Sequence, residues 1–426
     1  MRKLKVVLIG AGGRGNNYTS YMTEDKFSII AVAEPIKERR ESFKQRYNIS
    51  DDLCFDTWEK LLEKPKMADV AVIATSDSDH YAPAMKAIAM GYNLLLEKPI
   101  APTAKECVDI ANFAAEKGVK ILVCHVLRYT PFFTKIKSMI RNNDIGKIIS
   151  IHHSECVGHL HQSHSYVRGN WGNTEKSSSM LLAKSCHDID IIQWLIDSKC
   201  SYVQSFGSLS FFKKENAPEG APDYCIEGCP YKDECYYDAT AMYSVENDEW
   251  FKKHALQKEN PTQAELENLL RNTQYGKCVF KCDNDVVDHQ VVNLEYENGA
   301  VASFNMSAFN HGGRYIRIMG TDGEIYGDMT TNTLDYYSFK TDKHTIINPW
   351  EKNLNDSITT GHAGGDGGLV EILYKYMAED YNGDMLSEIA ISAENHLTVF
   401  AAEKSRLEKK VVNINEFNSE NGLVIR

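Results

Sequence analysis

Two short clusters of charged residues contain side chains that could move a proton to or from a substrate. Glu97-Lys98-Pro99 follows an apolar segment, and Lys184-Ser185-Cys186-His187-Asp188 opens a segment that continues as an apolar helix. A histidine accepts a hydroxyl proton near neutral pH, and burial shifts the pKa of a lysine toward neutrality. These properties predict Lys98, His187 and Lys184 as the catalytic residues. The structural alternatives are a surface ion pair before a proline turn and a helix-start histidine bonded to neighbouring carboxylates.

A glycine-rich loop, Gly10-Ala11-Gly12-Gly13-Arg14-Gly15, stands between a predicted strand and a predicted helix. In a G-x-G-x-x-G loop the first glycine makes a tight turn, the second lets the backbone approach a pyrophosphate, and the third lets helix and strand pack closely. The N-terminus of the helix faces the phosphate charge. The loop predicts a bound dinucleotide, with a ligand-free glycine turn as the alternative. The loop residues expected to bind it are Gly10, Gly12, Gly13, Arg14 and Gly15.

An acidic residue, Glu34, ends the next predicted strand, where a carboxylate would hold the ribose hydroxyls of the cofactor. The same charge would repel a 2′-phosphate, so the sequence favours NAD over NADP. Lys37, Arg39 and Arg40 follow closely and keep NADP open.

A third polar patch follows the predicted strand at 148–155. Its aromatic, amide and cationic side chains suit a polyhydroxylated ligand, because tryptophan stacks on a sugar ring while arginine and asparagine bond its hydroxyls. A solvated loop is the second interpretation, and a metal site built from the histidines is the third. The patch consists of His159, His161, His164, Arg168, Asn170 and Trp171.

Five of the eleven cysteines lie between Cys225 and Cys282, whereas the other six are scattered singly. Cysteine ligands can cross-link a small lobe that has too little core of its own. Four of these thiols could form a structural, tetrahedral zinc site, and free buried thiols are an equally weighted alternative. An iron–sulfur cluster is less favoured. The proposed metal ligands are Cys225, Cys229, Cys235 and Cys278.

Residues 4–125 alternate short apolar strands with amphipathic helices. Strands without polar alternation, separated by helices, indicate a parallel sheet covered on both faces, which is a doubly wound α/β domain. The predicted strands are Lys5–Ile9, Phe27–Ala33, Val70–Ala74, Leu94–Leu96 and Ile121–Cys124. The predicted helices are Ile36–Tyr47, Trp58–Glu63, Tyr81–Met90 and Ala104–Lys117.

From about residue 148 the strands are longer and alternate apolar with polar residues, which indicates an open, mostly antiparallel sheet. Hairpin turns are predicted at 297–299 and 321–323. The sequence therefore predicts a dinucleotide-binding domain at 1–126 and a substrate and oligomerisation domain at 127–426, with a cysteine-rich insertion at about 213–285. The predicted strands of this half are Ile148–Glu155, Val203–Phe212, Val286–Glu297, Ala300–Ala308 and Arg314–Met319, and its predicted helices are Met180–Ile196 and Leu386–Leu407.

Composition restricts the class of partner. The chain has 426 residues and a formal net charge of −12, which argues against a nucleic-acid partner. It has no apolar run long enough to span a membrane and no signal-peptide pattern at its start, so a cytoplasmic protein is expected.

The glycine loop, the Glu97-Lys98-Pro99 tripeptide and the Cys186-His187-Asp188-Ile189-Asp190 helix start occur in this order, and together they resemble the glucose–fructose oxidoreductase, inositol dehydrogenase and MocA family. The resemblance implies an N-terminal Rossmann domain, a C-terminal sheet whose exposed face often mediates oligomerisation, and oxidation of a sugar or cyclitol alcohol. A homodimer or homotetramer is therefore expected.

The resemblance assigns roles to individual residues. Lys98 matches the family's conserved lysine and His187 its catalytic histidine. The chain departs from the family at Ala183, where an aspartate is usual. Either Lys184 replaces that aspartate or a carboxylate comes from elsewhere, for which Asp288 is a candidate, although it could equally belong to a polar row on the sheet. Further cofactor contacts are expected from Thr75, Asp77, His80, Glu97 and Lys98. Substrate contacts are expected from Arg128, His164, Arg168, Trp171, Asp188 and His289.

The main hypothesis is an NAD-dependent oxidoreductase that acts on a secondary alcohol of a sugar, glycoside or cyclitol. A second hypothesis is a hydrolase or lyase that oxidises its substrate transiently, eliminates a substituent and recycles NAD. A third is a non-catalytic sugar or nucleotide sensor.

Overall fold

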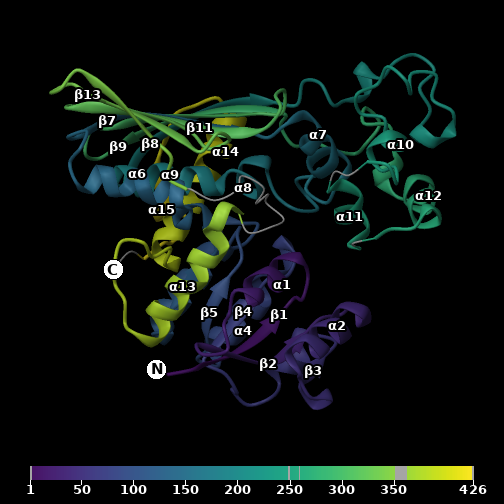
Figure 1. Ribbon diagram of the computed structural model, residues 1–426, viewed down its shortest axis with the longest axis horizontal. Helices are drawn as coiled ribbons and strands as arrows, with labels where there is room; N and C mark the ends of the chain where they lie inside the picture. Colours follow the sequence, from purple (N-terminus) through teal and green to yellow (C-terminus); the bar gives the residue numbers. More distant parts are fainter. Residues whose placement is uncertain (1, 248–249, 259, 351–361, 425–426) are drawn as a thin grey trace.

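The computed structural model describes residues 2–247, 250–258, 260–350 and 362–424. Its two sheets lie in different parts of the molecule, with the N-terminal sheet below the larger sheet and the cysteine-rich segment to one side (Figure 1).

The N-terminal sheet is parallel and six-stranded, with the order β3-β2-β1-β4-β5-β6. This is the strand order of a Rossmann fold, and it confirms the predicted doubly wound domain. The two-residue strand β3 is too short to leave a pattern in the sequence. The strands are β1 (Leu4–Ile9), β2 (Phe27–Ala33), β3 (Cys54–Phe55), β4 (Val70–Ile73), β5 (Asn93–Leu96) and β6 (Ile121–Val123). The helices are α1 (Gly13–Ser20), α2 (Lys37–Tyr47), α3 (Trp58–Leu62), α4 (Tyr81–Ala89) and α5 (Ala104–Lys117).

The second sheet has nine strands in the order β14-β13-β12-β11-β7-β10-β9-β8-β15. Among the described strands of this second sheet, only β10 and β7 pair in parallel, which confirms a mostly antiparallel sheet. Four of its strands, β12 to β15, were not predicted. The strands are β7 (Ile148–Cys156), β8 (Cys200–Ser208), β9 (His289–Tyr296), β10 (Val301–Ser307), β11 (Gly313–Gly320), β12 (Gly323–Asp328), β13 (Thr333–Ser338), β14 (Lys343–Ile347) and β15 (Val412–Asn413).

Helices cover one face of this sheet and leave the other face open (Figure 1). The covering helices are α6 (Pro131–Arg141), α9 (Cys186–Ile196) and α14 (Ile389–Glu408). The alternation along β9 follows from this, because Gln290, Val292, Leu294 and Tyr296 are buried on the covered face. The short helix α15 (Ile414–Glu420) follows β15.

The predicted helix at 180–196 is interrupted. It consists of α8 (Met180–Ala183) and α9, and Lys184 and Ser185 lie in the break. The hydroxyl of Ser179 caps α8 by accepting the amide of Leu182. The break places Lys184 at a turn between two buried helices.

The cysteine-rich lobe (residues 213–285) packs against a segment that runs from α7 (His159–His161) into a π-helix at Gln162–Arg168. Its helices are α10 (Ala239–Met242), α11 (Phe251–Leu256) and α12 (Gln263–Asn272). One further helix, α13 (Gly365–Ala378), packs its apolar face against the N-terminal sheet, although it lies late in the chain. The domain boundary near residue 126 stays a prediction.

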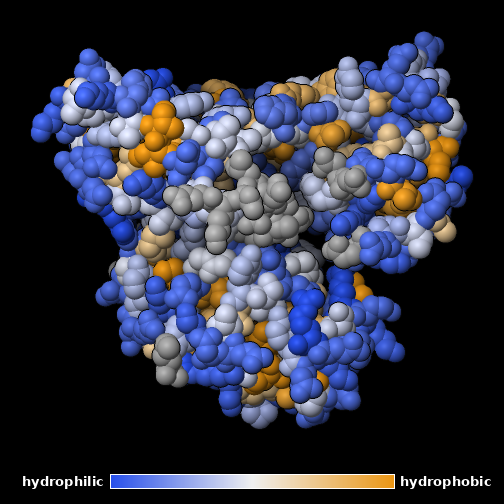
Figure 2. Space-filling view, in the orientation of Figure 1, coloured by the Kyte–Doolittle hydropathy of each residue, from blue (hydrophilic) through white to orange (hydrophobic). Residues whose placement is uncertain are grey.

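The visible face of the molecule is mainly hydrophilic, and its hydrophobic residues form small separate patches (Figure 2). Within the described part of the chain, no helix combines the length and apolar character that crossing a bilayer requires.

Candidate active site

The glycine loop has the geometry that a dinucleotide needs. Gly10 has a φ of +92°, and a Cβ there would lie 2.6 Å from the carbonyl oxygen of Ala74. A Cβ on Gly15 would lie 2.1 Å from the carbonyl oxygen of Gly10. By contrast, a Cβ on Gly13 would meet nothing within 4 Å, so the space above the start of α1 is open. The loop therefore fits a pyrophosphate beside the helix N-terminus.

Glu34 directly follows β2, and the glycine loop helps to fix its side chain. Its carboxylate accepts the amide of Ala11 at 2.8 Å and the amide of Ile36 at 2.9 Å, and the residue is buried. Arg40 turns back to the carbonyl oxygens of Glu34 and Pro35. The negative charge therefore stands beside the glycine loop, where a ribose would lie.

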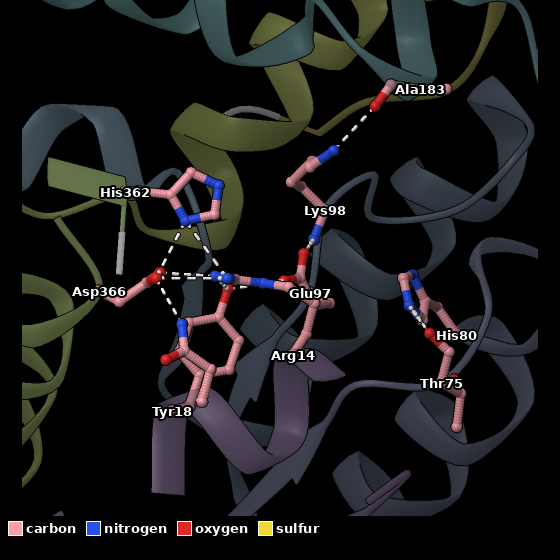
Figure 3. A network of polar contacts seen from close by, with 10 residues as sticks. Arg14, Tyr18, Thr75, His80, Glu97, Lys98, Ala183, His362 and Asp366 are labelled. Carbon is pink, nitrogen blue, oxygen red and sulfur yellow. Dashed lines mark hydrogen bonds and ion pairs between the residues drawn. The ribbon is translucent and has the colours of Figure 1, made fainter. Parts of the chain in front are cut away.

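Arg14, inside the glycine loop, is held by two carboxylates (Figure 3). Its Nε donates to Glu97 Oε1 at 2.9 Å, and its Nη2 donates to Asp366 Oδ1 at 2.5 Å. Tyr18 also donates to Glu97, and the second oxygen of Glu97 accepts the amide of Lys98. Burial raises the pKa of Glu97, but Arg14 and then Lys98 lower it by more, so that the net shift is downward. The geometry makes Glu97 a support for its neighbours, and direct contact of Arg14 or Glu97 with the cofactor stays a prediction.

Lys98 connects the two halves of the site. It follows β5 at a cis Lys98–Pro99 bond, and its Nζ donates to the carbonyl oxygen of Ala183 at 2.8 Å (Figure 3). The carboxyl ends of parallel strands bind the ligand in this fold. The ammonium group is thus anchored from the cofactor domain at the turn that carries Lys184.

His187 lies in the first turn of α9 and is only 6% exposed. Its Nδ1 has no hydrogen-bond partner among the described residues, and its ring meets His125 edge-on with centroids 5.7 Å apart. Burial first, and then Lys98 and His125, hold the pKa of His187 well below its usual value. A neutral imidazole at this position can accept a proton or a hydrogen bond.

A network of charged side chains from β7, α9 and β11 surrounds Lys184. Glu155 lies 3.3 Å from Lys184 Nζ, and its other oxygen lies 2.6 Å from Arg314. Arg314 also donates to Asp188, which accepts His153 Nε2 at 2.8 Å. Burial lowers the pKa of Lys184, and Glu155 opposes that shift. Asp288 does not belong to this network, because it accepts the amides of Ser210 and Phe211 instead.

A cavity of about 530 Å³ opens beside this network. Its polar wall contains Glu155, Lys184 and Arg314, and its apolar wall includes Trp250 and Trp350. Its volume falls within the range of small-molecule sites. The wall combines two cations with the carboxylates that neutralise them, and it offers aromatic faces to a sugar ring.

The loop after β4 is tied to the substrate side of the molecule. Asp77 accepts the indole N–H of Trp171 at 3.0 Å, and the indole ring lies nearly parallel to the ring of His254. His80 is fully buried, with Nδ1 at 2.7 Å from the carbonyl oxygen of Pro99 and Nε2 at 3.3 Å from that of Thr75. His80 therefore orients the backbone on either side of the cofactor edge, while cofactor contact by these residues stays a prediction.

Four residues expected at the substrate lie away from the cavity. Arg128 is buried against Asp190, and Arg168 donates to the carbonyl oxygens of Lys277 and Tyr237. Both ring nitrogens of His164 are occupied by the cysteine-rich lobe, through Tyr243 and His254. His289 projects from the open face of the sheet, where its side chain is 46% exposed. Their polar groups serve the fold because their hydrogen bonds are made internally.

The predicted zinc site needs correction. Cys225, Cys229, Cys235 and Cys278 line one small cavity of about 20 Å³, and all are free thiols. Within the described ranges, however, no group of three or more histidine, cysteine or acidic side chains is placed to hold a metal ion. Burial raises the pKa of Cys225 and Cys235, which keeps these thiols protonated. The lobe instead builds its own apolar clusters.

The sequence reasoning missed Glu155, Arg314, His362 and Asp366. A glutamate on the buried face of a strand signals a specific partner, because an unpaired buried charge is unfavourable. The spacing of His362 and Asp366, four residues apart beside several glycines, also permitted a paired interaction. No local pattern connected them with Arg14.

Matches to family models define the class of the protein. Residues 4–125 match the oxidoreductase family with an NAD-binding Rossmann fold, and residues 137–414 match the C-terminal alpha/beta domain of the same family. The chain belongs to the Gfo/Idh/MocA family of oxidoreductases.

Several relatives share part of this sequence. The chain is 25% identical over 340 residues to the putative oxidoreductase YteT of Bacillus subtilis, covering 75% of this chain and 74% of the relative. It is 23% identical over 219 residues to an inositol 2-dehydrogenase/D-chiro-inositol 3-dehydrogenase of Lactiplantibacillus plantarum. This match covers 50% of this chain and 58% of the relative. It is 25% identical over 190 residues to the 2,7-anhydro-N-acetylneuraminate hydratase of Escherichia coli, covering 44% and 48%. The chain thus spans about half the length of the latter two.

Solved structures share the whole fold. An oxidoreductase from Agrobacterium radiobacter in complex with NAD⁺, L-tartaric acid and magnesium superposes with a TM-score of 0.70 and 15% identity, covering 97% of this chain and 99% of that one. A levoglucosan dehydrogenase in complex with NADH superposes with a TM-score of 0.69 and 17% identity, covering 97% of this chain and 99% of that one.

Proposed function

We propose that this protein oxidises a secondary alcohol of a sugar, glycoside or cyclitol in an NAD-dependent reaction. The observation that carries the proposal is the contact of Lys98 with Ala183, because it brings the lysine of the cofactor domain to the turn that precedes His187. In this arrangement Lys98 and His187 hold the substrate hydroxyl, and Lys184 binds a neighbouring oxygen from the cavity wall. NAD, when bound, supplies the hydride acceptor.

The cavity wall supports an uncharged substrate. Lys184 and Arg314 are each paired with Glu155, and Arg314 is also paired with Asp188. A carboxylated substrate would have to displace these partners, whereas hydroxyl groups can bond alongside them. Trp250 and Trp350 offer stacking surfaces. These features favour a neutral polyol ring.

NAD is the preferred cofactor in this proposal. The buried carboxylate of Glu34 stands at the end of β2, where it would bond ribose hydroxyls and repel a 2′-phosphate. Arg39 and Arg40 are the residues that would favour NADP if Glu34 were neutralised.

A panel of neutral monosaccharides, glycosides and inositols tests the function. Each compound is incubated with the purified chain and either NAD⁺ or NADP⁺, and reduced cofactor is followed by absorbance. Reduction of NAD⁺ with at least one compound is expected, with a large loss in His187→Ala and retained NAD⁺ binding by calorimetry. Absence of reduction across the panel with intact NAD⁺ binding contradicts the dehydrogenase proposal.

A second candidate is elimination or hydrolysis with recycled NAD. The observation that favours it is Lys184, a buried lysine with a lowered pKa that lines the cavity and would act as a second proton-transfer group besides His187. Oxidation to a ketone would acidify the adjacent C–H, Lys184 would take that proton, the neighbouring substituent would leave with its bonding electrons, and a double bond would form. For hydrolysis, water would add across this double bond. NADH would then reduce the ketone again. Release of an aglycone from a chromogenic glycoside without accumulation of NADH supports this candidate. NADH formed in proportion to product supports the dehydrogenase.

We also propose that the open sheet face binds a second copy of the chain. The strand register places five exposed apolar residues on this face, namely Tyr202, Phe206, Val301, Tyr326 and Ile346. Association would remove this apolar surface from water.

A further inference from the structure

An imidazole–carboxylate pair reaches the cofactor loop from the C-terminal part of the chain. His362 Nδ1 lies 2.9 Å from Asp366 Oδ2, and Asp366 also binds Arg14 within the glycine loop (Figure 3). We propose that His362, oriented by Asp366, is the catalytic base that takes the substrate hydroxyl proton. This inference rests on the proposed dehydrogenase function and assigns its proton transfer to a different residue.

The backbone holds His362 in an uncommon conformation. His362, Ala363 and Gly364 have successive φ values of +46°, +52° and +86°, and such left-handed conformations are unfavourable for residues with a Cβ. They persist only where the surrounding structure enforces them, and they cluster at functional sites. The conformation sets the direction of the imidazole before α13 begins.

Close packing fixes the start of α13. A Cβ on Gly365 would lie 2.4 Å from the carbonyl oxygen of Val126, so only glycine permits this approach to the short helix Val126–Tyr129. Asp366 is fully buried beside it. Backbone contact therefore fixes the start of α13 against the helix Val126–Tyr129, and the side chains of Asp366 and Arg14 link it to the glycine loop.

The contacts of Asp366 determine which ring nitrogen of His362 carries the proton. Burial raises the pKa of Asp366, but His362 and then Arg14 lower it by more, so the carboxylate is ionised. An ionised carboxylate only accepts hydrogen bonds, so the ring donates through Nδ1–H. Arg14 Nη1 also lies 3.2 Å from Nδ1, but both Nη1 and Nη2 of Arg14 donate to Asp366. Among the described residues nothing bonds to Nε2, whose lone pair is therefore free there.

The free side of the ring faces the reaction centre. Figure 3 shows the other edge of the imidazole turned away from Asp366 and toward the side on which Lys98 lies. A charge on His362 would lower the pKa of His187. Burial also lowers the pKa of His362, so that the neutral form required of a base predominates.

His362 has a partner that His187 lacks. Among the described residues, no carboxylate forms an ion pair or hydrogen bond with His187, and its Nδ1 has no partner. Proton transfer to His362 Nε2 would create an imidazolium that Asp366 stabilises, which is the role of the carboxylate in a catalytic triad. In that step the O–H bond of the substrate breaks, an N–H bond forms on His362, and the carbinol hydrogen leaves with its electron pair as a hydride to NAD⁺. His187 then serves as a hydrogen-bonding group for the same oxygen.

The chain provides a matched control. His344 Nδ1 lies 2.8 Å from Asp335, so the pair has nearly the same geometry, but its imidazole is 61% exposed on β14. His362→Gln and His344→Gln therefore remove equivalent side chains from a buried and an exposed pair. Melting temperature and circular dichroism establish that both variants are folded.

The first test measures turnover with the sugar identified by the panel. General-base catalysis contributes on the order of 10²–10⁴-fold, so kcat of His362→Gln is expected to fall at least about 100-fold. Its Kd for NAD⁺, measured by calorimetry, is expected to stay within about threefold, and His344→Gln is expected to keep wild-type kcat. A kcat of His362→Gln within threefold of wild type overturns the assignment.

The second test does not depend on turnover. Ring-¹⁵N-labelled histidine in the full chain is observed by NMR at pH 7, with the signals of His362 identified from His362→Gln. The proton is expected on Nδ1, moving toward Nε2 in Asp366→Asn, and NAD⁺ is expected to shift the signals of His362 but not those of His344. A proton on Nε2 in the wild type, or no response to NAD⁺, overturns the inference. If the panel fails while NAD⁺ shifts His362, the proposed function is refuted and the position of His362 at the cofactor is supported.

Discussion

Replacing Arg128 by alanine is expected to destabilise the protein without weakening substrate binding. Arg128 is 1% exposed and donates to both oxygens of Asp190, at 2.7 and 2.6 Å, and to the carbonyl oxygen of Leu386. Alanine would leave Asp190 buried with Asn395 as its remaining close donor. Breaking a buried ion pair from one side costs about 3–5 kcal/mol of folding free energy.

The destabilisation of Arg128→Ala has a defined pH dependence. In the wild type, burial raises the pKa of Asp190, but Arg128 and then His125 lower it by more. That contribution to stability is complete above the unfolded pKa of about 4 and is lost only as the pH falls through the depressed pKa. Without Arg128, burial raises the pKa of Asp190, so the folded variant retains a proton where the unfolded chain has released it. The stability of the variant then falls as the pH rises, and its deficit is larger at pH 8 than at pH 5.

Urea unfolding at pH 5 and pH 8, monitored by tryptophan fluorescence, measures the loss of stability in Arg128→Ala. The control is Arg141→Ala, because Arg141 pairs with Asp384 at the surface, where an ion pair contributes about 0–1 kcal/mol. A wild-type urea midpoint for Arg128→Ala refutes the reasoning. So does a tenfold rise in the KM for the sugar in a variant of unchanged stability, since that result would place Arg128 in the substrate site.

Three further predictions follow from the same structure. Lys98→Met should lower kcat about 100-fold or more while NAD⁺ affinity stays within about threefold, and exposed Lys117→Met should behave as wild type; turnover of Lys98→Met within tenfold would contradict its role. Gly15→Ala should lower the melting temperature of the cofactor-free protein, because its Cβ would lie 2.1 Å from a loop carbonyl oxygen, whereas Gly13→Ala should leave it unchanged. Equal melting temperatures would refute this packing argument. Phe206→Lys should reduce the mass measured by light scattering to that of a monomer, and an unchanged oligomer would exclude the open sheet face as the interface.

The sequence predicted the features that depend on local order. Apolar strands separated by helices indicated the Rossmann sheet, and the glycine spacing located the turn that requires Gly10 and Gly15. Lys98 was identified because it directly follows a buried strand, whose carboxyl end lies at the ligand edge of such a sheet. These features follow from backbone sterics and from the direction of one strand, so neighbouring residues suffice to specify them.

The predictions that the structure did not support depended on contacts between segments that lie far apart in the sequence. Four cysteines of one inserted segment suggested zinc, but the fold places their thiols around a small cavity, and within the described residues no set of metal ligands is assembled. Arg128 and Arg168 suggested sugar contacts, but both are buried and bonded to the protein itself. The chemical type of a side chain does not show whether its hydrogen bonds are already satisfied, and burial decides this.

The sequence by itself indicated a Rossmann sheet that binds a nucleotide and a second, open sheet, and it proposed Lys98 and His187 for alcohol chemistry. The tertiary structure decided which groups surround them. It paired Lys184 with Glu155 of β7, and it brought His362 and Asp366 from the start of α13 to Arg14. The physical reason is that buried charges require partners, and the chain supplies those partners from segments that only folding brings into contact.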